Sequence, residues 1–132
     1  MKSNLNKLFK TDEKMEKEGI YFEVDSTTAF KIRRFNDKNP RAKAAMANHF
    51  KPYARQIELG TVDPEKMREI NVMIFVDVCL AGWEGVLDEN EKPIEFNRAN
   101  AIELLKELPD LFDTLWKHAN NFENYREDLG NS

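Results

Sequence analysis

The fold is decided by residues 63–81, DPEKMREINVMIFVDVCLA, where a helix start leads into a nearly continuous apolar run. Asp63 can cap a helix, and Pro64 suits its first position because an amide hydrogen would be unpaired there. Apolar residues then recur at helical spacing, namely Met67, Ile70, Ile74 and Val78. Residues 72–80 also have the composition of a buried strand, so both structures stay open for that run. We favour a helix that is apolar nearly all round and lies at the centre of the core.

The segments after this stretch contain further breaks and helix starts. The glycines of Gly82-Trp83-Glu84-Gly85 are expected to end the helix, and residues 87–96 to form a loop or loose hairpin around an acidic turn. Asn97 can cap a helix that Pro109 separates from a final one. Residues 123–132 are largely polar, so we expect them to form a frayed tail.

The segments before the central stretch are expected to contain a hairpin and a kinked helix. Residues 1–18 form a charged N-terminal helix or arm. Residues 20–35 hold two runs of aromatic and β-branched residues around a polar turn, which is the pattern of a β-hairpin. A helix over residues 40–59 should kink near Pro52, because proline removes a backbone donor and crowds the preceding turn.

Together these elements predict an α+β fold that is mostly α-helical, with an N-terminal β-hairpin packed on about four helices. The 132 residues are expected to form a single domain, 1–132, with the helical core over residues 40–121. Hydrophobic residues make up 41% of the chain and aromatic residues 11%, which is too much for a disordered chain although 33% of the residues are charged.

Charge is divided unevenly between the two halves of the chain. Residues 1–66 hold 14 Lys and Arg against 10 Asp and Glu, whereas residues 67–132 hold 6 against 14, and the net charge is −4. A basic first half and an acidic second half suit head-to-tail association between copies, so a homo-oligomer is one expectation.

Signals for disulfide bonding, secretion and membrane insertion are missing. Cys79 is the only cysteine, which excludes an intramolecular disulfide, and its apolar surroundings predict a buried inert thiol. The charged N-terminus has no signal-peptide pattern. The longest apolar run, residues 72–80, is interrupted by Asp77 and is too short to cross a bilayer. We therefore expect a cytoplasmic protein without a membrane partner.

No arrangement of side chains typical of catalysis or metal binding can be assembled. His49 and His118 are expected as surface or helix-capping residues. The chain contains no Gly-x-Ser-x-Gly, Gly-x-Gly-x-x-Gly or phosphate loop. Residues 88–93 imitate the start of a calcium loop, but Lys92 and Pro93 stand where an oxygen ligand and a glycine are needed. We expect a protein that is not an enzyme and that uses no cofactor or metal.

A basic stretch with interleaved aromatic residues lies between residues 30 and 56. Its basic face consists of Lys31, Arg33, Arg34, Arg41, Lys43, Lys51 and Arg55. Arginines and aromatic rings on a strand pair can hold phosphates and stack bases, so a small nucleic-acid-binding module is the alternative function. The net negative charge and the lack of a known binding motif instead favour a solvated face that complements the acidic half. Nucleic acid is therefore not the partner we expect.

The two tryptophans are expected to differ in role. Trp83 follows the core helix between two glycines, where a large ring can lock the next loop to the core. Trp116 lies off the strict apolar stripe of its helix, so we expect it to be partly exposed and available as an interface anchor. The residues predicted to be structural are Trp83, Gly82, Gly85 and Pro52.

The order of motifs along the chain also carries a family likeness. Trp-Glu-Gly-Val at 83–86 is followed by an acidic turn and by Pro-Ile-Glu-Phe at 93–96. Further pieces in matching order are Phe50-Lys51-Pro52-Tyr53, Gly60 to Asp63, Asn97 to Leu105, Leu108 to Asp113, Ala119-Asn120-Asn121 and Phe122 to Arg126. Over residues 20–127 this order resembles the tail assembly chaperones of long-tailed bacteriophages and prophages. Asn90-Glu91 departs from the Asn-Gly or Asp-Gly expected at the acidic turn.

The resemblance implies a non-catalytic protein that coats the tape measure protein and helps to recruit tail tube protein. It would act in the host cytoplasm and be absent from the mature virion. A tape measure chain is a long helix whose apolar stripe needs cover, so its holder needs an exposed apolar face. The residues expected to form this gripping face are Leu104, Leu108, Leu111, Phe112, Leu115 and Trp116. The alternative is that all of them except Trp116 belong to the core.

Overall fold

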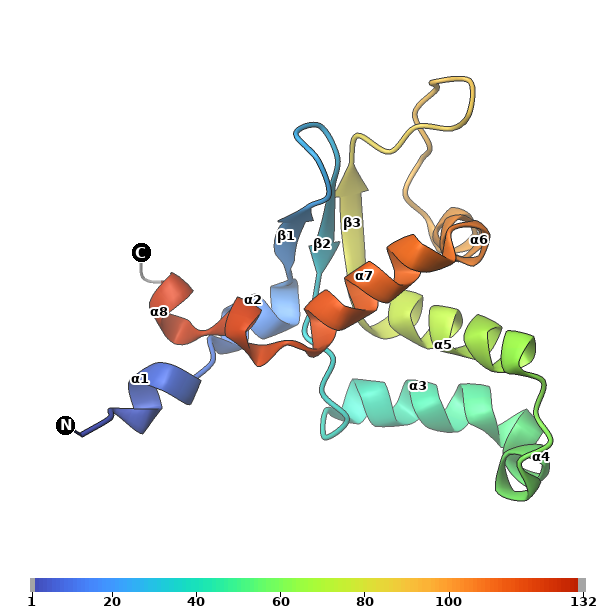
Figure 1. The fold of residues 1–132 in the computed structure, drawn as a ribbon, viewed down its shortest axis with the longest axis horizontal. Helices are drawn as coiled ribbons and strands as arrows, with labels where there is room; N and C mark the ends of the chain where they lie inside the picture. Colours follow the sequence, from blue (N-terminus) through green and yellow to red (C-terminus); the bar gives the residue numbers. More distant parts are fainter. Residues whose placement is uncertain (1, 131–132) are drawn as a thin grey trace.

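A three-stranded antiparallel sheet with helices packed against it forms the frame of the computed structural model, which describes residues 2–130 (Figure 1). The sheet has the order β1 (Ile20–Glu23), β2 (Ala29–Ile32), β3 (Leu80–Glu84). The predicted α+β, mostly helical fold is confirmed, and β1 and β2 form the predicted hairpin.

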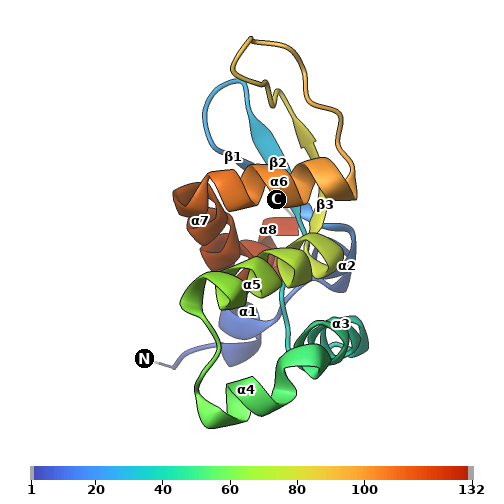
Figure 2. The same cartoon turned by 90° about the vertical axis from the view of Figure 1, so that its right-hand side faces the viewer.

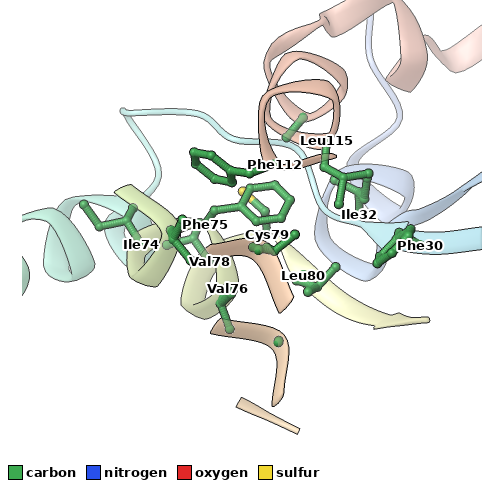
Figure 3. Packing of buried hydrophobic residues seen from close by; sticks show 14 of the residues in the cluster. Phe30, Ile32, Ile74, Phe75, Val76, Val78, Cys79, Leu80, Phe112 and Leu115 are labelled. Carbon is green, nitrogen blue, oxygen red and sulfur yellow. The ribbon is translucent and has the colours of Figure 1, made fainter. Parts of the chain in front are cut away.

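The central helix α5 (Pro64–Val78) confirms that the apolar stretch is helical. The Asp63 side chain accepts a hydrogen bond from the Glu65 amide and caps the helix as predicted. Figure 3 shows Phe75 of α5 beside Phe112 and among the apolar side chains of the core. Cys79, at the end of the helix, is buried, and burial raises the pKa of its thiol to about 12, so it is inert as expected.

The strand β3 corrects the expectation that the central helix runs on to a break at the glycines. The helix ends at Val78, and the next residues pair with β2, with Trp83 opposite Phe30. A two-stranded hairpin leaves the groups on the outer edge of β2 without partners, and pairing with β3 satisfies them. Gly82 therefore lies within a strand and does not break a helix.

The helices before and after α5 follow the predicted breaks. α3 (Pro40–Phe50) is capped by Asn39, and the chain then forms the 3₁₀ turn η1 (Lys51–Tyr53) and the short helix α4 (Ala54–Leu59), so it breaks at Pro52. After the sheet come α6 (Arg98–Glu107), which Asn97 caps, and α7 (Pro109–Asn120). Figure 1 shows α6 end-on and α7 running across the picture, so the chain turns sharply between them.

The two terminal segments pack against each other, contrary to the expectation of a frayed tail. The N-terminal arm contains α1 (Leu5–Phe9) and α2 (Glu13–Glu18), and the C-terminal segment contains η2 (Phe122–Tyr125) and α8 (Glu127–Gly130). Tyr125 is fully buried and its hydroxyl donates to the Ile32 carbonyl at 3.0 Å, while its own carbonyl accepts from the Asp12 amide at 2.8 Å. Residues 131–132 of the predicted tail lie outside the described residues.

Among the described residues 2–130, no helix is long and apolar enough to cross a membrane.

Candidate protein-binding surfaces

The six residues predicted to form one gripping face are divided among three places. Phe112 and Leu115 are buried in the core, which corrects the prediction that they are gripping residues, although Phe112 still borders one hollow from beneath its neighbours on α7. Leu111 and Trp116 are half-buried on α7, whereas Leu104 and Leu108 border a different hollow beside α6. The reason is the break at Leu108, where the backbone leaves helical geometry and the helical spacing does not continue into α7.

Trp116 is partly exposed, as predicted, and borders two adjoining hollows. The hollows have volumes of about 700 and 390 Å³, and both are bordered by Asp113 and Trp116. The residues around them, here called the Trp116 surface, are Pro64, Met67, Arg68, Asn71, Phe112, Asp113, Trp116, Lys117, Asn120 and Asn121. An apolar centre inside a polar border is the usual composition of a protein interface.

The Trp116 ring packs against three other aromatic rings of the protein. Its centroid lies 4.9 Å from that of Phe35, 5.9 Å from that of Phe112 and 6.1 Å from that of Phe75. Beside it, Arg68 donates to both carboxylate oxygens of Asp113 at 3.1 Å. The surface is therefore largely pre-organised, which lowers the entropy that binding would cost.

A second hollow, here called the acidic groove, lies between the turn after β3 and helix α6. Its volume is about 520 Å³. Its apolar lining consists of Leu87, Ile94, Leu104 and Leu108, and its carboxylates are Asp88, Glu89, Glu103 and Glu107. Two amides, Asn90 and Asn100, complete the described lining, which contains no lysine or arginine. A lining that combines apolar side chains with carboxylates alone among its charged groups suits a basic amphipathic segment.

The turn at residues 87–93 is shaped by one carboxylate of its own. Asp88 accepts from the amides of Asn90 at 2.8 Å and Lys92 at 3.0 Å, and Leu87 pairs with Pro93 across the turn. Glu91 adopts a left-handed φ of 60°, at the place where a glycine was expected. In the described part of the chain no group of carboxylates, histidines or cysteine is placed to hold a metal ion.

The basic residues of the hairpin are engaged with the N-terminal arm. Arg34 forms an ion pair with Glu16 at 2.7 Å, and the Arg33 side chain donates to the Lys17 carbonyl at 2.9 Å. Burial lowers the pKa of Arg33, and the nearby charge of Arg41 lowers it further. The remaining helical members of the predicted basic face are exposed, namely Arg41, Lys43, Lys51 and Arg55. Lys31 lies over the Tyr21 ring, 5.7 Å from its centroid.

The histidines and Asp77 have roles that sequence reasoning missed. His49 Nε2 lies 2.8 Å from the Asp77 carboxylate, which also accepts from Arg98 at 2.7 Å, so Asp77 joins three helices. Burial raises the pKa of Asp77, but the hydrogen bonds from Arg98 and His49 outweigh it and lower the pKa. The sequence did contain a signal for the role of Asp77, since it is a charged residue inside an apolar run. His118 is neither exposed nor a cap: it is half-buried, and burial lowers its pKa.

Trp83 holds the next loop to the core as predicted, whereas Gly85 stands at the end of β3 and not at the end of a helix. Trp83 donates to the Ile94 carbonyl at 2.9 Å and packs edge-on against Phe30 and Phe96, which holds the following loop to the sheet. Gly85 has a φ of 74°, and a Cβ there would overlap the Thr27 carbonyl oxygen. Gly82 has open space around it, so nothing in its surroundings requires a glycine.

The fold and these surfaces define a small, mostly helical α+β protein with two hollowed surfaces. A family model described as YdaY prophage protein matches residues 37–130, and the chain belongs to this family of prophage proteins. The matched range runs from just before α3 into α8 and contains the Trp116 surface and the acidic groove, but not the hairpin. No curated protein and no solved structure matches the chain.

Proposed function

We propose that this prophage protein is a tail assembly chaperone that binds and solubilises the tape measure protein and helps to recruit tail tube subunits. It acts without catalysis, in the host cytoplasm, and leaves before the virion is complete. Two facts support the proposal: the chain belongs to a prophage protein family, and its motif order resembles such chaperones.

The observation that carries the proposal is the Trp116 surface. Trp116 is partly buried and borders two hollows, and tryptophan is among the residue types most enriched in the energetic centres of protein interfaces. The polar residues around it form a rim that can exclude water from the contact, and both signs of charge are present there through Asp113 and Lys117.

The mechanism is stoichiometric occupancy of the partner. A long helix with an uncovered apolar stripe aggregates, because exposed apolar area associates non-specifically in water. Copies of this domain that each cover one segment of the stripe keep the helix soluble until the tube subunits replace them. Affinity per copy need only be moderate, since each copy must leave again.

The test is co-expression with a tape measure fragment, followed by copurification and by measurement of the affinity. Trp116→Ala should weaken binding at least about tenfold, as expected for the loss of an interface hot spot. Tyr21→Ala is the matched control, because Tyr21 is an aromatic residue exposed at 52% that lies on β1, outside this surface. Circular dichroism must show that both variants are folded.

The outcomes separate this function from the alternative. Unchanged binding by folded Trp116→Ala removes the Trp116 surface from the proposal, and no binding by the wild-type chain removes the function. A salt titration identifies nucleic-acid binding, because contacts with phosphate weaken steeply and linearly with the logarithm of the salt concentration, whereas apolar contacts do not.

A further inference from the structure

The N-terminal helix leaves three apolar side chains largely exposed. Leu5, Leu8 and Phe9 are 64%, 42% and 59% exposed, and α1 contains no buried residue. The segment 2–10, here called the basic head, carries lysines at positions 2, 7 and 10 and no acidic residue. It is a short amphipathic segment of positive charge without a full partner in its own chain.

The acidic groove has the complementary composition. Leu87 and Leu108 in its lining are 50% and 46% exposed, so apolar area is open to a partner there. Its four carboxylates belong to Asp88, Glu89, Glu103 and Glu107. The head carries apolar side chains and lysines, and the groove carries apolar side chains and carboxylates. Docking would therefore cover apolar area on both and pair opposite charges.

The two features cannot meet within one chain. Figure 1 places α1 and the loop between β3 and α6 at opposite ends of the molecule, and the view turned by 90° in Figure 2 also separates them. The arm is held at its end by the C-terminal segment: Phe9 stacks on Phe122 at 5.4 Å, and Lys10 pairs with Glu127 at 3.3 Å. The head therefore points away from its own groove.

We propose that the basic head of one copy docks in the acidic groove of a second copy, so that the protein associates head to tail. This contact joins two different patches, so each bound copy still offers a free head and a free groove, and the assembly grows into a ring or an open chain. It does not involve the Trp116 surface and does not depend on the proposed function.

The first measurement is the mass of the purified full chain in solution, by light scattering and analytical ultracentrifugation. The mass should rise with protein concentration at low salt, to twice the monomer mass and beyond. Raising salt from about 50 mM to about 500 mM should weaken association at least tenfold, because the lysines and carboxylates are screened. A chain that stays monomeric at every concentration in low salt overturns the proposal.

Two complementary variants test the direction of the contact. The head variant is Leu5→Asp with Lys7→Glu, and the groove variant is Glu103→Lys with Glu107→Lys; all four side chains are exposed. Each variant alone should be monomeric. Mixed in equal amounts, they should associate again, because the unchanged head of the groove variant fits the unchanged groove of the head variant.

Matched controls exclude effects of charge or folding. Leu59→Asp with Lys51→Glu repeats the head changes at exposed positions on α4 and η1, and Leu59 has the same exposure as Leu5, 64%. Glu58→Lys with Glu123→Lys repeats the groove changes elsewhere. Both controls should associate as the wild type does. The proposal is overturned if either variant associates on its own or if the mixture stays monomeric. It is also overturned if the groove binds another basic protein but not the head of a second copy.

Discussion

Helices α5 and α7 are in contact through aromatic rings, yet only α5 is enclosed by the rest of the domain. Phe75 of α5 lies 5.7 Å from Phe112 and 6.1 Å from Trp116, both on α7, measured between ring centroids. Six residues of α5 are buried, on several sides of the helix, whereas α7 buries one stripe, Phe112, Leu115 and Ala119. The second half of α5 is enclosed on several sides and serves the fold, whereas its first turns border the Trp116 surface. A helix that is enclosed along one stripe, as α7 is, keeps an exposed side that a partner can use.

The largest expected effect on stability comes from shortening a buried side chain of α5. Phe75→Ala should lower the free energy of unfolding by about 3–5 kcal/mol, because it removes a fully buried ring and leaves a cavity that its packed neighbours cannot fill. Equilibrium urea denaturation measures the change. A loss below about 2 kcal/mol would mean that neighbouring side chains move in to fill the cavity. The packing around α5 would then not be tighter than that around α7.

The equivalent change on α7 should cost less. Trp116→Ala removes a larger ring, but that side chain is already partly exposed, so we expect a loss of about 1–2 kcal/mol in the same denaturation experiment. A cost equal to that of Phe75→Ala would show that Trp116 is a core residue, which would break the comparison and weaken its role as an interface anchor.

Local signals explain why most helices were predicted correctly. The caps at Asn39, Asp63 and Asn97 each accept a hydrogen bond from an amide two or three residues later, so the information lies within a few residues. The break at Pro52 is local in the same sense, because a missing amide hydrogen acts on its own turn. The single domain predicted for residues 1–132 stays a prediction.

Long-range pairing explains what was missed. β3 forms because β2 has a free edge, and nothing near Leu80 indicates that edge in the sequence. Tyr125 is buried because its hydroxyl meets the Ile32 carbonyl, 93 residues away. For the candidate site, Trp116 was predicted from its position off the apolar stripe, whereas the acidic groove depends on how a turn and a helix meet in space.

The one charged residue in the apolar half of α5 gives a smaller, sharper test. Asp77→Asn should destabilise the protein by about 1 kcal/mol near neutral pH, because it replaces charge-assisted hydrogen bonds to Arg98 and His49 with weaker ones at a site open to some solvent. Because the folded pKa of Asp77 lies below 3.8, its stabilisation is present above that pH and is lost as pH falls through the folded value. The variant should lack this loss in acid unfolding curves.

The smallest effect concerns His118 on α7 and appears in a different pH range. Burial penalises the imidazolium, so the folded pKa lies below the ordinary 6.5, and Nε2 is buried with no hydrogen-bond partner in the described structure. As pH falls below 6.5, the unfolded chain takes up a proton that the folded chain refuses, and the free energy of unfolding falls until the folded pKa is reached.

His118→Phe keeps a ring that packs against Phe22 and Tyr125, at centroid distances of 4.6 and 6.1 Å in the wild type, but it cannot take up a proton. The stability difference between variant and wild type should therefore grow in favour of the variant as pH is lowered from about 7.5 to 5.5, a range above the titration of ordinary carboxylates. Thermal unfolding at several pH values measures it. If the stability difference between the two proteins does not change with pH, the His118 imidazolium is solvated in the folded state. The side of α7 that faces the core would then be more open to water than α5 is.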